Sequence, residues 1–388
     1  MSERNSEFEG RGAGGIGRRA LLKATPIAAA GIVLGASNLA VAAGRPGGGS
    51  LPAVMPDFQP TYHADGSVSY AKGLVPPTDK NIRYRGRWQE QANGYVYGYY
   101  ESGLEFGFTG TSLSVTLEGT CRLLYSVDGG AFQRNINASG TLTIASGLKK
   151  GVHSVKIYSE YQQSFPKLMY FEIDHGASIK PCIKKPIMEF VGDSISVGYI
   201  GPGLTNSLGS SFSFKTPELL GFSHNTVAFG GIAVAPGSGA PDGTGMVSRY
   251  SKLSEYVPGE SNVPEWDTST YVPDYLVINL GTNDPSTGTR APNFKPAYMT
   301  FLENARMYYP GAVIFAMSPF NGAHRNEISE TVSARNATGD AKVVYINAYG
   351  WIDSATETTD GTHPTIAAHE KISVRLATSI QNYLTARH

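Results

Sequence analysis

Short apolar runs recur at intervals of roughly 30 to 50 residues through the second half of the chain. Few polar residues interrupt these runs, so each run has two faces that need to be buried. Strands of this kind belong to parallel sheets that helices cover on both sides. The sequence therefore predicts a three-layer α/β domain, closed by a helix over 366–384, where apolar residues follow helical spacing. The five predicted parallel strands cover 187–191, 226–229, 275–280, 313–317 and 343–346.

The segment from Asn81 to about Ile179 has a different pattern of apolar residues. Apolar residues alternate with polar or small ones in short runs, as at 113–117, and turn residues separate the runs. Asp128-Gly129 directly after one such run is a strong hairpin signal. Period-two runs without a helical stretch between them favour a β-sandwich. We assign 44–77 to a linker rich in Gly and Pro, 78–182 to the β-sandwich and 183–388 to the catalytic α/β domain.

The first 43 residues have the features of an export signal. Arg18-Arg19 precedes a mildly apolar stretch at 24–36, and Ala40-Val41-Ala42 offers a small-residue cleavage site. This pattern resembles the bacterial twin-arginine signal. The apolar stretch is shorter than the ~20 strongly apolar residues that a membrane span needs. We therefore expect export by the twin-arginine route to the periplasm or the outside, with no stable membrane span.

The charged residues balance, with 32 basic and 32 acidic side chains. A nucleic-acid partner is not expected, because such proteins carry an excess of basic residues. Cys121 and Cys182 are the only cysteines, so they allow at most one disulfide and no cysteine-based metal site. The histidines lack the short spacing of metal ligands, and no metal is predicted. The sequence does not indicate an oligomeric state or whether the cysteines pair.

Small polar clusters follow four of the predicted strands. In an open parallel sheet the carboxyl ends of the strands meet at one edge, where ligands bind. A serine hydroxyl, glycine N–H groups, an asparagine amide and an Asp-x-x-His pair would gather there. Acyl transfer needs this set as nucleophile, oxyanion donors, base and orienter. The clusters are Gly192-Asp193-Ser194-Ile195-Ser196, Gly230-Gly231, Gly281-Thr282-Asn283-Asp284 and Asp360-Gly361-Thr362-His363-Pro364.

In this order the four clusters resemble the conserved blocks of the SGNH (GDSL) hydrolases. The resemblance implies that Ser194 is the nucleophile, that His363 is its base and that Asp360 orients the histidine. It also implies an oxyanion hole formed by the Ser194 backbone N–H, Gly231 and Asn283, and it implies no cofactor. The second cluster departs from the family pattern, which often has serine before this glycine.

Three motifs in the predicted β-sandwich domain, at 84–87, 106–113 and 147–153, resemble the N-terminal β-sandwich of the family-two carbohydrate esterases. Enzymes of that family deacetylate plant-wall polysaccharides, and a jelly-roll domain precedes their SGNH domain. Some of them lack an acid partner for the catalytic histidine. The presence of Asp360 three residues before His363 favours a full triad here.

We therefore expect a secreted serine esterase that removes acetyl groups from polysaccharides or oligosaccharides through an acyl-enzyme intermediate. Two other functions stay open: a broader esterase or lipase on aryl, glyceride or polyester substrates, and a carbohydrate-binding protein with a relict esterase domain. Trp266 and Trp351 are candidates for stacking on sugar rings, although core packing explains them equally well. Asp193 is expected to tie the turn that holds the nucleophile, and Asp284 to brace the loop of Asn283.

Overall fold

The computed structural model of the chain describes residues 56–387 except 93, 95, 100, 162–163, 202–206, 238–242, 255–261, 287 and 289–290. The predicted twin-arginine signal, 1–43, lies outside the described residues. Within the described part of the chain, no helix is long and apolar enough to cross a membrane.

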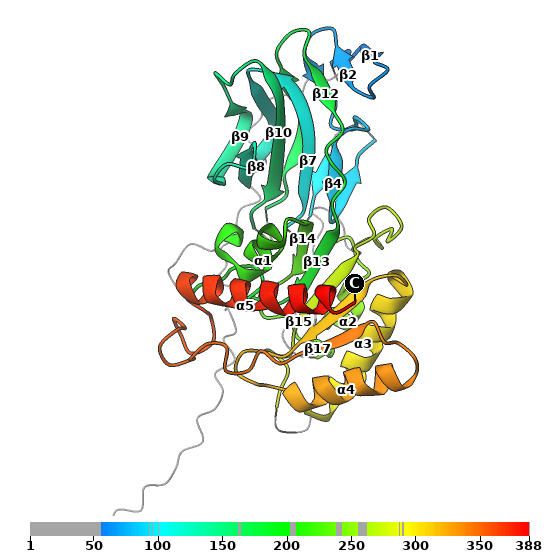
Figure 1. The fold of residues 1–388 in the computed structure, drawn as a ribbon, viewed down its shortest axis with the longest axis vertical. Helices are drawn as coiled ribbons and strands as arrows, with labels where there is room; N and C mark the ends of the chain where they lie inside the picture. The colour runs from blue at the N-terminus through cyan, green and yellow to red at the C-terminus, as the bar shows by residue number, and fades with distance from the viewer. Residues whose placement is uncertain are drawn as a thin grey trace, which may run out of the picture. The chain divides into compact units, whose positions relative to one another are not determined.

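The second half of the chain forms a five-stranded sheet in which all neighbouring strands are parallel (Figure 1). The strand order is β14-β13-β15-β16-β17, so the first strand of this domain lies between the second and the third. The predicted five-stranded parallel sheet is confirmed. The strands are β13 (Ile187–Gly192), β14 (Ser223–Ala228), β15 (Tyr275–Asn279), β16 (Val313–Met317) and β17 (Val343–Ile346).

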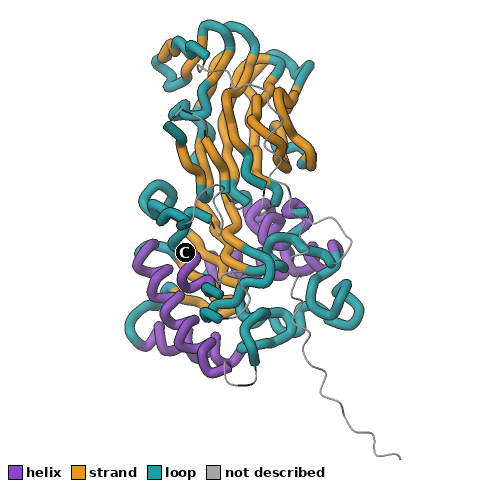
Figure 2. The backbone as a smooth tube through the Cα atoms, turned by 180° about the vertical axis from the view of Figure 1, so that it is seen from behind, coloured by secondary structure: helices purple, strands orange, loops and turns teal. Residues whose placement is uncertain are grey.

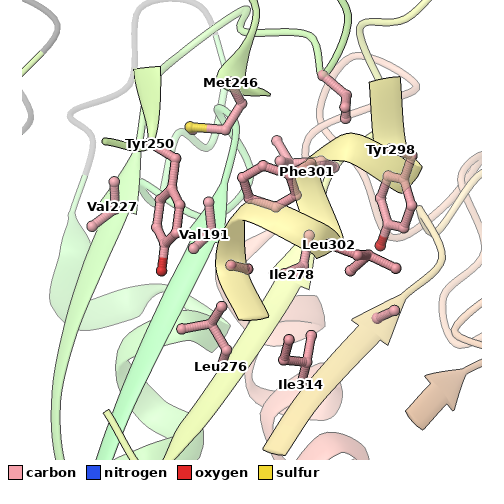
Figure 3. Close-up of a cluster of buried hydrophobic side chains, with 14 of the residues drawn as sticks. Val191, Val227, Met246, Tyr250, Leu276, Ile278, Tyr298, Phe301, Leu302 and Ile314 are labelled. Carbon is pink, nitrogen blue, oxygen red and sulfur yellow. The ribbon is translucent and has the colours of Figure 1, made fainter. Parts of the chain in front are cut away.

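Helices cover both faces of this sheet, and alternation along the strands decides which side chains meet which helices. Val191 and Ile278 contribute to a core with residues of α2, α3 and α4, whereas Phe190 and Val277 contribute to a second core with residues of α1 and α5. Figure 3 shows the first of these cores, in which side chains from the strands face those of α2 and α3. The predicted closing helix is confirmed as α5. The helices are α1 (Phe212–Leu220), α2 (Met246–Arg249), α3 (Phe294–Tyr308), α4 (Arg325–Ala337) and α5 (Ile366–Thr385).

The strands β1 to β12 form an antiparallel β-domain. They follow one another without a helix in the described part of this region (Figure 2). One long strand, β8, pairs with β11 along its first half and with β10 along its second. The strands are β1 (Pro60–Tyr62), β2 (Val68–Tyr70), β3 (Leu74–Val75), β4 (Arg83–Arg85), β5 (Trp88–Glu90), β6 (Val96–Gly98), β7 (Gly103–Gly110), β8 (Leu113–Val127), β9 (Gln133–Ala145), β10 (Gly151–Ser159), β11 (Lys167–Ile173) and β12 (Ser178–Lys180).

The antiparallel sheet folds over on itself and encloses a core. Phe106 on β7 and Phe171 on β11 are fully buried, and their ring centroids are 5.0 Å apart although two other strands separate β7 from β11 in the hydrogen-bonding order. The predicted hairpin is confirmed, because Asp128 and Gly129 both have positive φ (54° and 70°) between β8 and β9. The jelly-roll connectivity stays a prediction.

The linker predicted at 44–77 needs a correction. Residues 60–75 form β1, β2 and β3, which pair with each other or with β11 and β12. Val68, Tyr70 and Val75 are at most 5% exposed and belong to the β-domain core. The segment is rich in turn residues, but the burial of these few apolar side chains is enough to stabilise its packing on the sheet.

Candidate active site

Three of the predicted polar clusters begin at the same level of the parallel sheet. Gly192 at the end of β13 lies opposite Ala228 of β14 on one side and Asn279 of β15 on the other. The residues that follow these three positions therefore leave the sheet at a common edge. This is the edge at which open parallel sheets bind ligands.

A tight turn after β13 carries Ser194. The backbone carbonyl of Asp193 accepts hydrogen bonds from the N–H groups of Ser196 (3.1 Å) and Val197 (3.2 Å), and the Ser194 carbonyl accepts one from Tyr199 (3.0 Å). A Cβ at Gly192 would collide with Oγ of Ser196, so the turn requires glycine there. The hydroxyl of Ser194 is thus held at the end of the strand by backbone geometry.

The side chains of Ser194, His363 and Asp360 form a continuous hydrogen-bonded series. Oγ of Ser194 is 2.8 Å from Nε2 of His363, and Nδ1 of the same ring is 2.7 Å from Oδ2 of Asp360. The side chains of His363 and Asp360 are 14% and 21% exposed, so the series is accessible from solvent. The structure brings these three predicted residues together in the order that a serine hydrolase needs.

The other carboxylate oxygen of Asp360 is also occupied. Oδ1 accepts hydrogen bonds from the backbone N–H groups of His363 (2.9 Å) and Thr362 (3.1 Å). Burial opposes ionisation of Asp360, but these N–H groups and the imidazole outweigh it and hold the pKa of this carboxyl below its ordinary value. An ionised Asp360 accepts a hydrogen bond from Nδ1–H, which leaves Nε2 free of hydrogen and able to accept the proton of Ser194.

Tyr199 is a site residue that the sequence analysis missed. Its ring packs edge-on against the imidazole of His363, with 4.4 Å between ring centroids and 77° between the planes. Its backbone N–H donates to the carbonyl of Ser194, so one residue contacts both Ser194 and His363. A tyrosine five positions after Ser194 has no sequence signature of its own, and only the path of the folded turn brings it to His363.

The structure also brings Asn283 to the loop that carries Gly231. Nδ2 of Asn283 donates to the backbone carbonyl of Ile232, the next residue after Gly231, over 3.0 Å. Gly231 has φ of 82°, a conformation that favours glycine. An amide nitrogen has two hydrogens, so this bond leaves the second hydrogen of Asn283 for another acceptor.

Two buried carboxyl groups flank these residues. Asp193 is fully buried and Oδ1 accepts the backbone N–H of Ile195 (3.0 Å), which ties the turn as expected; burial raises the pKa of Asp193 to about 7. Asp284 is 4% exposed and accepts the N–H groups of Val234 (2.9 Å) and Ala235 (3.0 Å). Burial raises the pKa of Asp284, while the two N–H groups partly oppose this effect.

The two predicted sugar-stacking residues lie in different environments. Trp266 is half-buried, packs on the core that contains α2 and α3, and faces the guanidinium of Arg87 at 5.8 Å. Trp351 is half-buried against the core that contains α5, and its carbonyl accepts a hydrogen bond from Arg375. A role in sugar binding stays a prediction for both. Among the described residues, no group of three or more His, Cys, Asp or Glu side chains is placed to hold a metal ion.

Comparison with known proteins assigns both halves of the chain to families. Residues 188–376 match the GDSL-like Lipase/Acylhydrolase family, and residues 84–182 match the Carbohydrate esterase 2 N-terminal family. Both resemblances that the sequence motifs indicated are therefore confirmed.

Two relatives are similar over much of the chain. Cellulase/esterase CelE of Acetivibrio thermocellus is 31% identical over 340 residues, which cover 81% of this chain and 41% of the relative. An acetylxylan esterase / glucomannan deacetylase of Cellvibrio japonicus is 27% identical over 244 residues, which cover 57% of this chain and 65% of the relative. The chain thus spans less than two thirds of the length of either protein.

Solved structures support the same assignment. A family two carbohydrate esterase from Clostridium thermocellum, in complex with cellohexaose, is 27% identical with a TM-score of 0.67 over 78% of this chain and 99% of the other. An acetyl xylan esterase (Est2A) from the rumen bacterium Butyrivibrio proteoclasticus has the same fold, at 19% identity and a TM-score of 0.68 over 80% and 98% of the two chains. Residues 188–376 therefore form a GDSL-like lipase/acylhydrolase domain, and residues 84–182 form an N-terminal domain of carbohydrate esterase family 2.

Proposed function

We propose that this protein is a serine esterase that removes acetyl groups from polysaccharides or oligosaccharides through an acyl-enzyme intermediate. The observation that carries the proposal is the series from Ser194 through His363 to Asp360, with hydrogen bonds of 2.8 and 2.7 Å. A serine hydroxyl alone is a weak nucleophile, and an oriented imidazole activates it by accepting its proton.

In the first step, Oγ of Ser194 attacks the carbonyl carbon of the ester while its proton moves to Nε2 of His363. The negative charge on the carbonyl oxygen is stabilised by the backbone N–H groups of Ser194 and Gly231 and by the amide of Asn283. The tetrahedral intermediate then collapses. The bond to the sugar oxygen breaks, His363 gives its proton to this oxygen, and the acetyl group stays on Ser194.

In the second step, water replaces the sugar hydroxyl. His363 accepts a proton from water, the resulting nucleophile attacks the acetyl carbonyl, and the same oxyanion donors stabilise the second intermediate. Acetic acid leaves when the proton returns from His363 to Oγ of Ser194, and it then ionises to acetate in solution. Asp360 stays ionised throughout and stabilises the imidazolium that forms in each step.

The relatives support a carbohydrate ester as the substrate. The Cellvibrio protein is named an acetylxylan esterase / glucomannan deacetylase, and the Clostridium esterase was solved with cellohexaose. The accessibility of the His363 and Asp360 side chains is compatible with an acyl group carried by a bulky polymer. A lipase or aryl esterase uses the same catalytic groups, so the acyl and alcohol preferences distinguish these functions.

An acyl-chain series tests the proposal. Hydrolysis of p-nitrophenyl acetate, butyrate, octanoate and palmitate is measured, followed by release of acetate from acetylated xylan and glucomannan. We expect the highest kcat/KM with the acetyl ester and release of acetate from at least one polysaccharide. A preference for long chains would identify a lipase, and no turnover of any ester would identify a binding protein with a relict esterase domain.

We also propose export by the twin-arginine route, on the basis of Arg18-Arg19 and the apolar stretch that follows. Replacing both arginines with lysine keeps the charge and removes the paired guanidinium groups. We expect the wild-type protein in the periplasm or the medium and the double variant in the cytoplasm. Equal export of the two proteins would contradict this route.

A further inference from the structure

The two loops proposed to supply oxyanion donors besides Ser194 follow strands that are not neighbours. The Gly231 loop (residues 229–235) follows β14, and the Asn283 loop (residues 280–284) follows β15. β13 lies between these strands in the sheet (Figure 1), so no ladder of backbone hydrogen bonds connects the bases of the two loops. Their relative position needs another connection, because an oxyanion hole acts only when its donors converge on one point.

The carboxylate of Asp284 makes this connection. Oδ2 accepts the N–H of Val234 at 2.9 Å and Oδ1 accepts the N–H of Ala235 at 3.0 Å, so both oxygens bind the Gly231 loop. The side chain lies in the Asn283 loop directly after Asn283, and the residue is 4% exposed.

Further contacts hold both sides of this connection. Nδ2 of Asn283 donates to Ile232 of the Gly231 loop. Nε2 of His324 lies 3.2 Å from the backbone carbonyl of Asp284, and because a carbonyl only accepts, the ring nitrogen donates. His324 is 5% exposed and stacks on Phe294, with ring centroids 3.9 Å apart. The Asn283 loop is thus fixed from the Gly231 loop on one side and from the start of α4 on the other.

We infer that Asp284 is a positioning residue that fastens the two donor loops of the oxyanion hole to each other and so sets the spacing between Asn283 and the Gly231 N–H. The inference rests on the proposed function, because it assigns a role within the same active site. It predicts a loss in the chemical step and not in substrate binding when the connection is weakened.

Asp284→Asn is the first variant. The amide keeps one acceptor oxygen and places an NH₂ group against the second backbone N–H, so one of the two bonds is lost without a change in size. Because a small displacement of catalytic groups is costly, we expect kcat on p-nitrophenyl acetate to fall about tenfold to a hundredfold. KM should stay nearly constant, as for an interaction that matters only in the transition state.

A double-mutant cycle with Asn283→Ala separates positioning from a general structural role. If Asp284 acts by placing Asn283, the loss caused by Asp284→Asn becomes much smaller when Asn283 is already alanine, because neighbouring effects of this kind are not additive. An equal loss of kcat in both backgrounds, an increase in KM with constant kcat, or wild-type kinetics of Asp284→Asn would each overturn the inference.

Asp174→Asn is the matched control. Asp174 also accepts a backbone N–H, that of Thr111 at 2.6 Å, but it lies at the end of β11 in the β-domain. We expect this variant to lose thermal stability while kcat stays unchanged. If Asp284→Asn does not fold, Asp284→Glu replaces it in the same cycle, because it keeps the carboxylate but its additional methylene displaces the two loops relative to each other.

The outcomes for this inference and for the proposed function are distinguishable. An inactive wild-type protein, or a Ser194→Ala variant with full activity, would refute the proposed function itself. Wild-type activity that depends on Ser194, together with a loss of kcat in Asp284→Asn that is independent of Asn283, would refute only the positioning role.

Discussion

Asp360 uses one carboxylate oxygen to hold the backbone of His363 and the other to hold its imidazole. Oδ1 lies 2.9 Å from the backbone N of His363, and Oδ2 lies 2.7 Å from Nδ1 of the same residue. With the Asp-x-x-His spacing, one carboxylate therefore holds both the backbone and the imidazole of His363.

Asp360→Asn is expected to lower kcat by at least about a hundredfold at neutral pH. Oδ1 faces two backbone N–H groups, so the amide oxygen of asparagine takes that place and the NH₂ group faces Nδ1 of His363. Nδ1 then has to accept, the proton moves to Nε2, and the imidazole can no longer take the proton of Ser194. Steady-state kinetics on p-nitrophenyl acetate measure this effect.

Asp353→Asn is the control for this variant. Asp353 caps a turn earlier in the same loop through the N–H of Ala355 (2.9 Å), and its replacement should leave kcat unchanged. If Asp360→Asn retains nearly the wild-type kcat, the carboxylate only shapes the loop, and the full triad is wrong.

Asn283→Ala should lower kcat about a hundredfold with little change in KM, since the loss of one oxyanion donor typically costs ~3 kcal/mol of transition-state stabilisation. Asn321→Ala provides a comparison, because Asn321 caps an exposed turn through the N–H of Ala323 and should not affect turnover. A rise in KM at constant kcat would instead assign Asn283 to substrate binding.

Tyr199 should act through its ring and not through its hydroxyl group. The ring packs edge-on against His363, so Tyr199→Ala removes a wall that limits the motion of the imidazole and should lower kcat about tenfold. Tyr199→Phe keeps the ring and should retain the wild-type kcat. Equal losses in the two variants would show that the hydroxyl matters and that the packing argument is wrong.

Asp193 gives the folded state a pH dependence that can be isolated. Burial raises its pKa from 3.8 to about 7, so the folded protein keeps this proton over a range in which the unfolded chain releases it. The contribution of Asp193 to stability is therefore complete below about pH 4 and is lost as the pH rises through about 7. Asp193→Asn imitates the protonated form and should lack this loss.

Thermal unfolding of the wild type and Asp193→Asn between about pH 4 and pH 8 tests this statement. The Tm of the variant, relative to that of the wild type, should increase steadily with pH. A constant difference across this range would mean that Asp193 has an ordinary pKa in the folded protein.

The sequence predicted the parallel sheet well because its strands are buried on both faces and therefore appear as apolar runs. β14 is the instructive exception. It begins at Ser223 and not at 226, since its first residues are polar but buried with partners elsewhere in the fold. Ser223 donates to Glu105 (2.7 Å), and Nε2 of His224 lies 2.9 Å from Oε1 of Glu218. Glu105 is 118 residues from Ser223, and Glu218 lies outside the strand, so an apolar-run criterion cannot find these partners.

In the site, too, local sequence motifs predict some features, whereas others depend on tertiary structure. Ser194, Asn283, Asp360 and His363 lie in short motifs after strands, so their common location follows from the parallel sheet. The edge-on contact of Tyr199 depends on the path of a turn, and the bonds of Asp284 depend on the order of the strands. The spacing of residues along the chain predicts neither of these contacts.

Covalent labelling tests the central assignment most directly. The protein is treated with a fluorophosphonate, which reacts with activated serines, and the adduct is located by mass spectrometry in the wild type, Ser194→Ala and Ser196→Ala. We predict a single adduct on Ser194 in the wild type and in Ser196→Ala, and neither adduct nor ester hydrolysis in Ser194→Ala at an unchanged Tm. An adduct on Ser196, or full hydrolysis by Ser194→Ala, would contradict the account.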